Sequence, residues 1–124
     1  MNCDKIFIRD LLVRCIIGVN DEERHQKQDV IINITMYADL RNACRSDRIE
    51  DTVNYKTVKK RVLAMVEQSS FLLIEKLAGE IAEICLKEPR VQKVKVSVDK
   101  PSALRFSRSA AIEIKRSRND EKQP

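Results

Sequence analysis

The sequence predicts a single α+β domain in which a four-stranded antiparallel sheet carries two helices on one face, in the order β-β-α-α-β-β. Three observations support this fold class. Alternating apolar and polar residues, typical of strands with one buried face, occur in the first and last thirds of the chain. Two stretches with helical spacing lie between them. The chain is also of single-domain length, and we expect the domain to span residues 1–117, followed by a disordered tail at 118–124.

The first two strands are expected to form a long antiparallel hairpin. The first runs over Lys5–Ile17, and its alternation shifts by one residue after Asp10. Such a shift predicts a β-bulge near Arg9 and Asp10. A charged loop follows at 20–28, and the second strand is predicted over Asp29–Asp39.

The middle of the chain carries the predicted helices. We expect a short helical turn at Arg41–Cys44 and a longer helix over Lys56–Gln68, where apolar residues recur every three or four positions. A second apolar stripe runs from Ile74 to Cys85. Ser69 and Ser70 are candidates to cap the start of this second helix, because serine side chains accept hydrogen bonds from free helical N–H groups.

The closing hairpin places a lysine at the end of a strand. Valines alternate with charged and polar residues up to Lys100, and Pro101 then ends the strand because it has no N–H to donate. A second alternation covers 110–115. The connection of roughly nine residues is longer than most hairpin loops, and long loops at the end of a sheet often carry function.

The overall charge raises nucleic-acid binding as a hypothesis. The formal net charge is +5 and the isoelectric point is near 9.1. The basic residues are dispersed, however, and the few aromatic residues form no recognizable stacking platform, so we expect no nucleic-acid partner. No apolar run approaches the roughly 18 residues of a membrane span. Because the N-terminus lacks a signal-peptide pattern, we expect a cytoplasmic protein without a membrane partner.

The cysteines do not suggest a metal site. Cys3, Cys15, Cys44 and Cys85 lie far apart without a CxxC pair, and His25 is the single histidine. We interpret all four as reduced thiols and place Cys15 and Cys85 on apolar faces. His25 belongs to a charged loop and is expected to be exposed.

Most standard catalytic motifs are missing from the sequence. It has no glycine-rich phosphate loop, no nucleophile elbow and no HExxH motif. Four single candidates for chemistry remain: Glu23, Tyr55, Glu75 and Lys100. Each has a structural alternative, since Glu23 and Lys100 could be solvated charges and Glu75 could favour the N-terminal dipole of a helix.

Five segments, in their order and spacing, resemble the dihydroneopterin aldolase family, which includes the dihydroneopterin triphosphate epimerases. They are GVNDEE at 18–23, QDV at 28–30, DTVNY at 51–55, FLLIEKLA at 71–78 and VDKP at 98–101. The similarity extends over about residues 4–116. Asn54 and the stretch 99–106 resemble the epimerase branch more than typical aldolases.

The resemblance implies a fold, an assembly and a reaction. The fold would be the tunnelling fold (T-fold), assembled through sheet edges into a homo-tetramer or homo-octamer with active sites between subunits. The substrate would be 7,8-dihydroneopterin or its triphosphate, cleaved to 6-hydroxymethyl-7,8-dihydropterin and glycolaldehyde, epimerised at C2′, or both. The family works by acid–base chemistry without a metal or cofactor and serves pterin and folate biosynthesis.

The resemblance also assigns roles to residues. Glu23 would act as the base at the side-chain hydroxyl, with Tyr55 assisting it, and Lys100 would act as the acid near N5. Substrate-binding residues would be Glu75 as the pterin anchor with Ile74 beside it, and Val53 and Tyr55 from the adjacent subunit. Arg24 and Arg105 are candidate phosphate contacts because they lie in loops that could flank the substrate side chain.

Several alternatives remain at this stage. A related T-fold enzyme, such as a cyclohydrolase or a pyruvoyl-tetrahydropterin synthase, would need a zinc or Cys/His site. A non-catalytic pterin-binding scaffold and a basic nucleic-acid-binding oligomer are two further hypotheses. The sequence leaves open aldolase against epimerase activity, free dihydroneopterin against its triphosphate, tetramer against octamer, and the pterin pathway.

Overall fold

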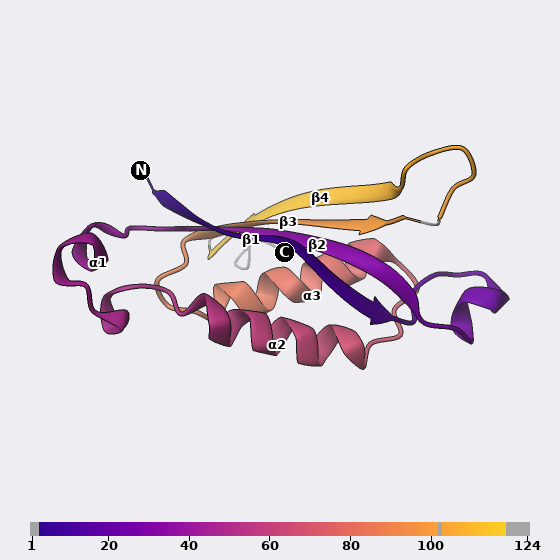
Figure 1. The fold of residues 1–124 in the computed structure, drawn as a ribbon, viewed down its shortest axis with the longest axis horizontal. Helices are drawn as coiled ribbons and strands as arrows, with labels where there is room; N and C mark the ends of the chain where they lie inside the picture. Colours follow the sequence, from indigo (N-terminus) through magenta and orange to yellow (C-terminus); the bar gives the residue numbers. More distant parts are fainter. Residues whose placement is uncertain (1–2, 102, 119–124) are drawn as a thin grey trace.

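The computed structural model describes residues 3–101 and 103–118 and has the predicted order of strands and helices (Figure 1). The strands are β1 (Asp4–Cys15), β2 (Gln28–Ala38), β3 (Lys93–Lys100) and β4 (Ala110–Ser117). The helices are α1 (Arg41–Ser46), α2 (Tyr55–Glu67) and α3 (Ile74–Leu86), with the short 3₁₀ turns η1 (Asp21–Arg24) and η2 (Ile49–Asp51). The expected tail at 118–124 lies outside the described residues apart from Arg118, whose N–H donates to the carbonyl of Gln92.

The four strands form one antiparallel sheet in the order β1-β2-β3-β4, so that β1 and β4 are its edges. The predicted bulge is confirmed, because Ile8 pairs with Ile34 and Leu11 with Ile32, which leaves two residues of β1 opposite Asn33. At the bulge Asp10 has a φ of 54°, and its N–H donates to Asn33 Oδ1 at 2.8 Å.

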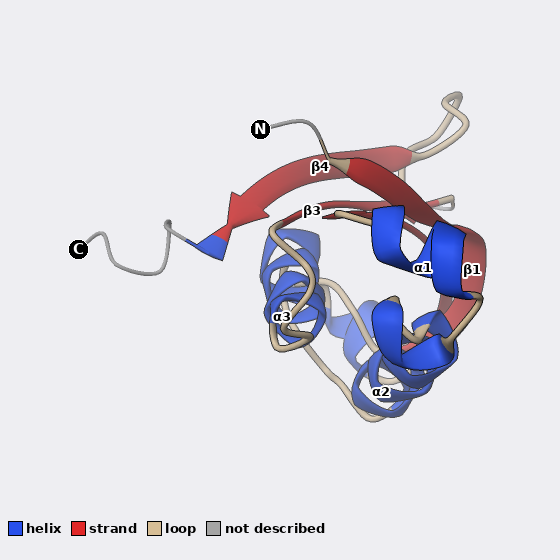
Figure 2. Cartoon of the chain, turned by 90° about the vertical axis from the view of Figure 1, so that its left-hand side faces the viewer, coloured by secondary structure: helices blue, strands red, loops and turns tan. Residues whose placement is uncertain are grey.

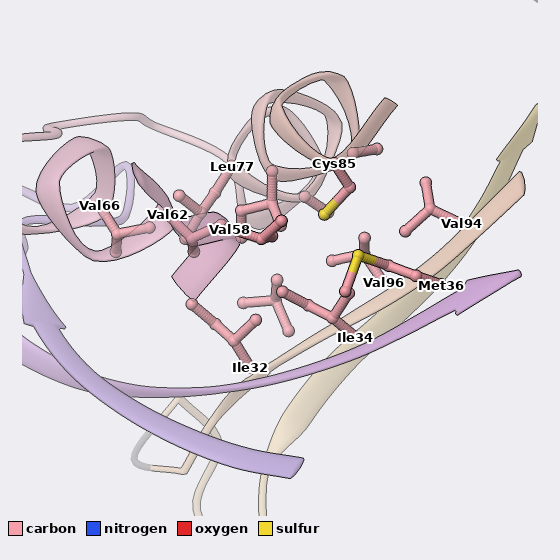
Figure 3. Packing of buried hydrophobic residues seen from close by; sticks show 14 of the residues in the cluster. Ile32, Ile34, Met36, Val58, Val62, Val66, Leu77, Cys85, Val94 and Val96 are labelled. Atoms are coloured by element: carbon pink, nitrogen blue, oxygen red, sulfur yellow. The ribbon is translucent and has the colours of Figure 1, made fainter. Parts of the chain in front are cut away.

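Helices α2 and α3 cover one face of the curved sheet (Figure 2), as the apolar patterns predict. Val58, Val62 and Val66 form one buried stripe of α2, at a spacing of four residues. They pack with buried residues of α3 and of the two central strands (Figure 3): Ile32, Ile34, Met36, Leu77, Ile81, Cys85, Val94, Val96 and Val98. Each fully buried aliphatic side chain contributes about 1.5–3 kcal/mol, so this layer holds the helices against the sheet.

The start of α3 differs from the prediction. The helix begins at Ile74 after an extended Leu73, and neither Ser69 nor Ser70 caps it. Ser69 Oγ instead donates to the carbonyl of Val66 at 2.7 Å and so closes the preceding helix. The linker between the two helices is tied to the segment that follows β1, because the N–H of Gly18 donates to the carbonyl of Phe71 at 3.2 Å.

The molecule has two distinct ends along its long axis (Figure 1). At one end β3 finishes, η1 projects, α2 ends and α3 begins. At the other end α2 begins next to η2 and the end of α3, where Arg90 donates to the carbonyl of Glu50 at 2.8 Å. The 13 residues of α2 separate the two ends by about 20 Å. In the part of the chain that the structure describes, no helix combines the length and apolarity that crossing a membrane requires.

Candidate active site

Two of the predicted residues, Glu23 and Lys100, meet although 77 positions separate them in the sequence. Lys100 Nζ donates to Glu23 Oε2 at 2.6 Å. The Glu23 side chain is only 20% exposed and that of Lys100 only 11%. Lys100 is the last residue of β3, and Glu23 lies in η1, so the sheet and the first loop bring the pair together at one end of the molecule (Figure 1).

The carboxylate of Glu23 is held by a set of donors. Gln28 Nε2 donates to Oε2 at 3.1 Å, and the N–H of Asn20 donates to Oε1 at 3.2 Å. Gln28 Nε2 also donates to the carbonyl of Ile17 at 2.7 Å, which ties its amide to the end of the first strand. The hydrogen bond from Lys100 lowers the pKa of Glu23 below its usual range; burial opposes this shift, and Gln28 and Asn20 add to it. The pair therefore places an ionised carboxylate within hydrogen-bond distance of the Lys100 amino group.

Gly18 makes room for this carboxylate. Its φ of +126° lies in a region that residues with a Cβ rarely adopt. A Cβ built at this position would lie 2.2 Å from Glu23 Cδ, well inside contact distance. The GVNDEE segment thus requires glycine at position 18 for two reasons, its backbone conformation and the approach of Glu23.

Glu75 lies apart from this pair, in the first turn of α3, where its charge suits the helix N-terminus. Its side chain is exposed, while Ile74 packs partly against the core. Glu75 borders a groove between α3 and the end of β4. The groove is lined by Glu75, Lys76, Gly79, Glu80, Ala82, Glu83, Leu86, Arg116 and Ser117.

The structure places Val53 and Tyr55 at the other end of the molecule. Val53 is buried, with 1% exposure, whereas Tyr55 is 55% exposed as the first residue of α2. Asn54 caps this helix, its Oδ1 accepting from the N–H groups of Lys56 and Thr57 at 3.1 and 3.3 Å. Since α2 separates the two ends by about 20 Å, one chain does not bring Tyr55 to Glu23 and Lys100.

The two candidate phosphate contacts have different surroundings. Arg105 is exposed in the β3–β4 loop, with its guanidinium 5.1 Å from the ring centre of Phe106. Arg24 is half-buried, and its guanidinium donates to three backbone carbonyls, those of Gly18, Ser70 and Phe71. Sequence reasoning missed these contacts of Arg24, because backbone acceptors leave no signature in a sequence.

Gln28 was also missed as a partner of Glu23. Its position in the QDV segment, five residues after Glu23, was the available signal. Cys15 is buried as predicted, and burial raises the pKa of its thiol, although the neighbouring Ser69 hydroxyl and the charge of Lys100 act in the opposite direction. His25 is exposed as expected. Among the residues described, no three His, Cys, Asp or Glu side chains are grouped as a metal site.

Comparison with known proteins identifies the family. The family model for dihydroneopterin aldolase (FolB) matches residues 6–115. The dihydroneopterin triphosphate 2′-epimerase of Pseudomonas aeruginosa is 38% identical over 110 residues, which cover 89% of each chain. The folic acid synthesis protein FOL1 of Dictyostelium discoideum is 40% identical over 91% of this chain, although the chain spans only 17% of that protein's length.

A solved structure agrees in fold. The Escherichia coli dihydroneopterin aldolase in complex with neopterin superposes with a TM-score of 0.88 and 32% sequence identity, covering 92% of this chain and 99% of that one. The four-stranded antiparallel sheet with its two covering helices is therefore the T-fold, as the family resemblance implies. The chain belongs to the dihydroneopterin aldolase family.

Proposed function

We propose that this protein is an enzyme that acts on the side chain of 7,8-dihydroneopterin or its triphosphate by acid–base catalysis. The observation that carries the proposal is the contact between Glu23 and Lys100 at 2.6 Å. It places an ionised carboxylate beside a lysine side chain that can donate a proton or a hydrogen bond.

The chemistry of the substrate explains why a base and an acid suffice. Dihydroneopterin has a C6=N5 double bond next to its side chain. When a base removes the 2′-hydroxyl proton, the C1′–C2′ bond can break, and its electron pair moves into the ring while N5 takes up a proton. Glycolaldehyde leaves, and proton transfer from N5 to C1′ then gives 6-hydroxymethyl-7,8-dihydropterin.

Glu23 and Lys100 fit these two proton transfers. Glu23 would accept the hydroxyl proton, since its lowered pKa keeps it ionised at neutral pH. Lys100 would supply the proton near N5, directly or through water. Positioned acid–base groups contribute roughly 10²–10⁴-fold in rate, so losing either one should be severe but should leave substrate binding largely intact.

Glu75 is proposed as the pterin anchor. An ionised carboxylate can accept two parallel hydrogen bonds from the 2-amino group and N3 of a pterin ring. Its exposed position at the edge of the α3 groove supports this role. The solved relative from Escherichia coli, which has the same fold and is in complex with neopterin, supports a pterin as the ligand. Ile74 would contribute the adjacent backbone.

A second copy of the chain would complete the site. Val53 and Tyr55 lie at the start of α2, and Lys100 lies at the other end of the molecule, past the roughly 20 Å length of that helix, so they would contribute to the site of a neighbour. The edge strands β1 and β4 offer unpaired backbone groups through which copies can join their sheets into a ring. We therefore propose a homo-tetramer, or an octamer of two rings, with active sites between subunits.

Cleavage and epimerisation would share this site. If glycolaldehyde stays bound and re-adds through its other face, C2′ is inverted and the monapterin form results. The ratio of the two products then depends on how long the fragment is retained. The likeness to an epimerase over 89% of both chains supports the second outcome, and the exposed Arg105 is a candidate contact for a triphosphate. Either product would belong to pterin or folate biosynthesis.

Product analysis tests the proposal. The purified protein is incubated separately with 7,8-dihydroneopterin and with its triphosphate, and the oxidised products are separated by chromatography with fluorescence detection. Mainly hydroxymethylpterin from the free compound indicates an aldolase. Mainly monapterin, formed faster from the triphosphate, indicates an epimerase. Absence of turnover of both compounds would contradict the proposal and favour a pterin-binding scaffold.

A further inference from the structure

Arg24 follows the proposed base Glu23 in the chain, but its own contacts are with the backbone. Nη1 donates to the carbonyl of Gly18 at 3.0 Å and to that of Phe71 at 3.1 Å, and Nη2 donates to the carbonyl of Ser70 at 2.5 Å. The side chain is half-buried. A planar guanidinium can serve several acceptors at fixed angles, which a single ammonium group cannot do.

The three acceptors belong to two separate segments. Gly18 follows the end of β1 and borders the Glu23 carboxylate. Ser70 and Phe71 belong to the α2–α3 linker, which leads within a few residues to Glu75. The same linker carbonyl of Phe71 also accepts from the N–H of Gly18. Arg24 therefore joins the loop that carries Glu23 to the linker that precedes Glu75.

We propose that Arg24 is a positioning residue that fixes the Glu23 loop relative to the segment carrying Glu75. This inference rests on the proposed function, in which those two carboxylates hold opposite ends of one substrate. It replaces a phosphate contact as the role of Arg24, since both terminal nitrogens of the guanidinium already donate to carbonyls. The exposed Arg105 then remains as the candidate phosphate contact.

The two roles of Arg24 give different kinetics. If Arg24 positions the loop, Arg24→Met lowers kcat/KM for dihydroneopterin and for its triphosphate by the same factor, about 10- to 100-fold, because a displacement of about 1 Å is costly to catalysis. Arg24→Lys keeps the positive charge but lacks the planar guanidinium with several donors. Its kcat/KM should therefore lie between those of Arg24→Met and the wild type. If Arg24 binds phosphate, the loss is confined to the triphosphate.

Arg118→Met is the matched control. Arg118 Nη2 also donates to a backbone carbonyl, that of Glu88 at 2.5 Å, but at the end of the sheet where β3 begins. Its loss should leave kcat/KM for both substrates near the wild-type value. A comparable loss in Arg118→Met would overturn the proposal, because any half-buried arginine bonded to the backbone would then have the same effect.

A second readout is independent of turnover. The pKa of Glu23 is measured by ¹³C NMR of its carboxyl group in the full-length protein, and thermal unfolding is recorded alongside it. Positioning predicts that Arg24→Met raises this pKa, because a loosened loop weakens the hydrogen bond from Lys100. If Arg24→Met does not fold, the same measurement on Arg24→Lys decides the question.

The outcomes separate the two proposals. An unchanged Glu23 pKa in a folded Arg24 variant, or a loss confined to the triphosphate, overturns the positioning role. If the wild-type protein turns over neither substrate, the proposed function fails. The NMR titration still shows whether Arg24 holds the Glu23 loop, so each proposal can fail alone.

Discussion

Lys100 at the end of the third strand donates a hydrogen bond of 2.6 Å to Glu23 in the first loop, and both side chains are largely shielded from solvent. This contact lowers the pKa of Glu23. Folding thus favours the ionised form of the carboxyl group. The resulting stabilisation is fully present above the unfolded-state pKa of about 4.3 and is lost as the pH falls through the lower pKa of the folded state.

Lys100→Met should therefore raise the pKa of Glu23. The largest cause of the lowered value is removed, while burial, which acts in the opposite direction, remains. Titration of the Glu23 carboxyl by ¹³C NMR measures the change, with the exposed Glu22 as an internal control in the same spectrum. A Glu23 pKa that does not move would show that the contact with Lys100 is not maintained in solution.

Gly18→Ala should impair both stability and turnover. The positive φ is strained for alanine, at a cost of about 1–3 kcal/mol. The new methyl group would also displace the Glu23 carboxylate, which reduces kcat roughly 10- to 100-fold. Denaturant unfolding and steady-state kinetics measure the two effects.

Gly79→Ala is the matched stability control for that substitution. Gly79 lies within α3, and a Cβ at this position meets nothing within 4 Å. Alanine there should stabilise the helix by about 0.5–1 kcal/mol. If Gly18→Ala were as stable and as active as the wild type, Gly18 would not be required for the position of the Glu23 carboxylate.

Much of the fold was predictable because burial patterns are local. Alternation located all four strands, and the one-residue shift after Asp10 located the bulge. The start of α3 was not predictable from the serines alone. A serine hydroxyl can donate to a carbonyl at the end of one helix or accept from an N–H at the start of the next. Ser69 donates to the carbonyl of Val66, at the end of α2.

The site was predictable only in part. Residue type and position made the loop residue Glu23 and the strand-end residue Lys100 candidates, but periodicity gives the face on which a residue lies and not its partner 77 positions away. The contacts of Arg24 could not be foreseen, since every residue carries a carbonyl. The family resemblance supplied the roles of Glu23, Lys100, Glu75 and Tyr55, and their participation in catalysis or binding remains a prediction.

Glu75→Gln should weaken pterin binding. A neutral amide cannot accept both hydrogen bonds from the ring, and a lost hydrogen bond to a charged group costs about 1.5–3 kcal/mol, so Kd for neopterin should rise roughly 10- to 100-fold. Fluorescence titration with neopterin measures Kd. Glu83 lines the same groove about two turns further along α3, and the control variant Glu83→Gln should bind neopterin with nearly the wild-type Kd. If Kd rose in Glu83→Gln but not in Glu75→Gln, the pterin anchor would be Glu83 and not Glu75.

Mixing two inactive variants tests the shared active site. Tyr55→Ala and Lys100→Met should each be nearly inactive as pure oligomers. Mixed at equal ratio after reversible dissociation, they should regain about one quarter of wild-type activity, because random assembly rebuilds that share of intact sites between neighbours. If Tyr55 and Lys100 served the same site from one chain, mixing would restore nothing.

The most direct test of the account is the turnover of 7,8-dihydroneopterin and its triphosphate by the wild type, Glu23→Gln and Lys100→Met, with neopterin binding measured in parallel. The exposed neighbour Glu22→Gln serves as control. We predict that Glu23→Gln and Lys100→Met each lose roughly 10²–10⁴-fold in kcat, while Kd for neopterin changes only a few-fold. If either Glu23→Gln or Lys100→Met turned over the substrates at the wild-type rate, Glu23 and Lys100 would not be the acid–base pair.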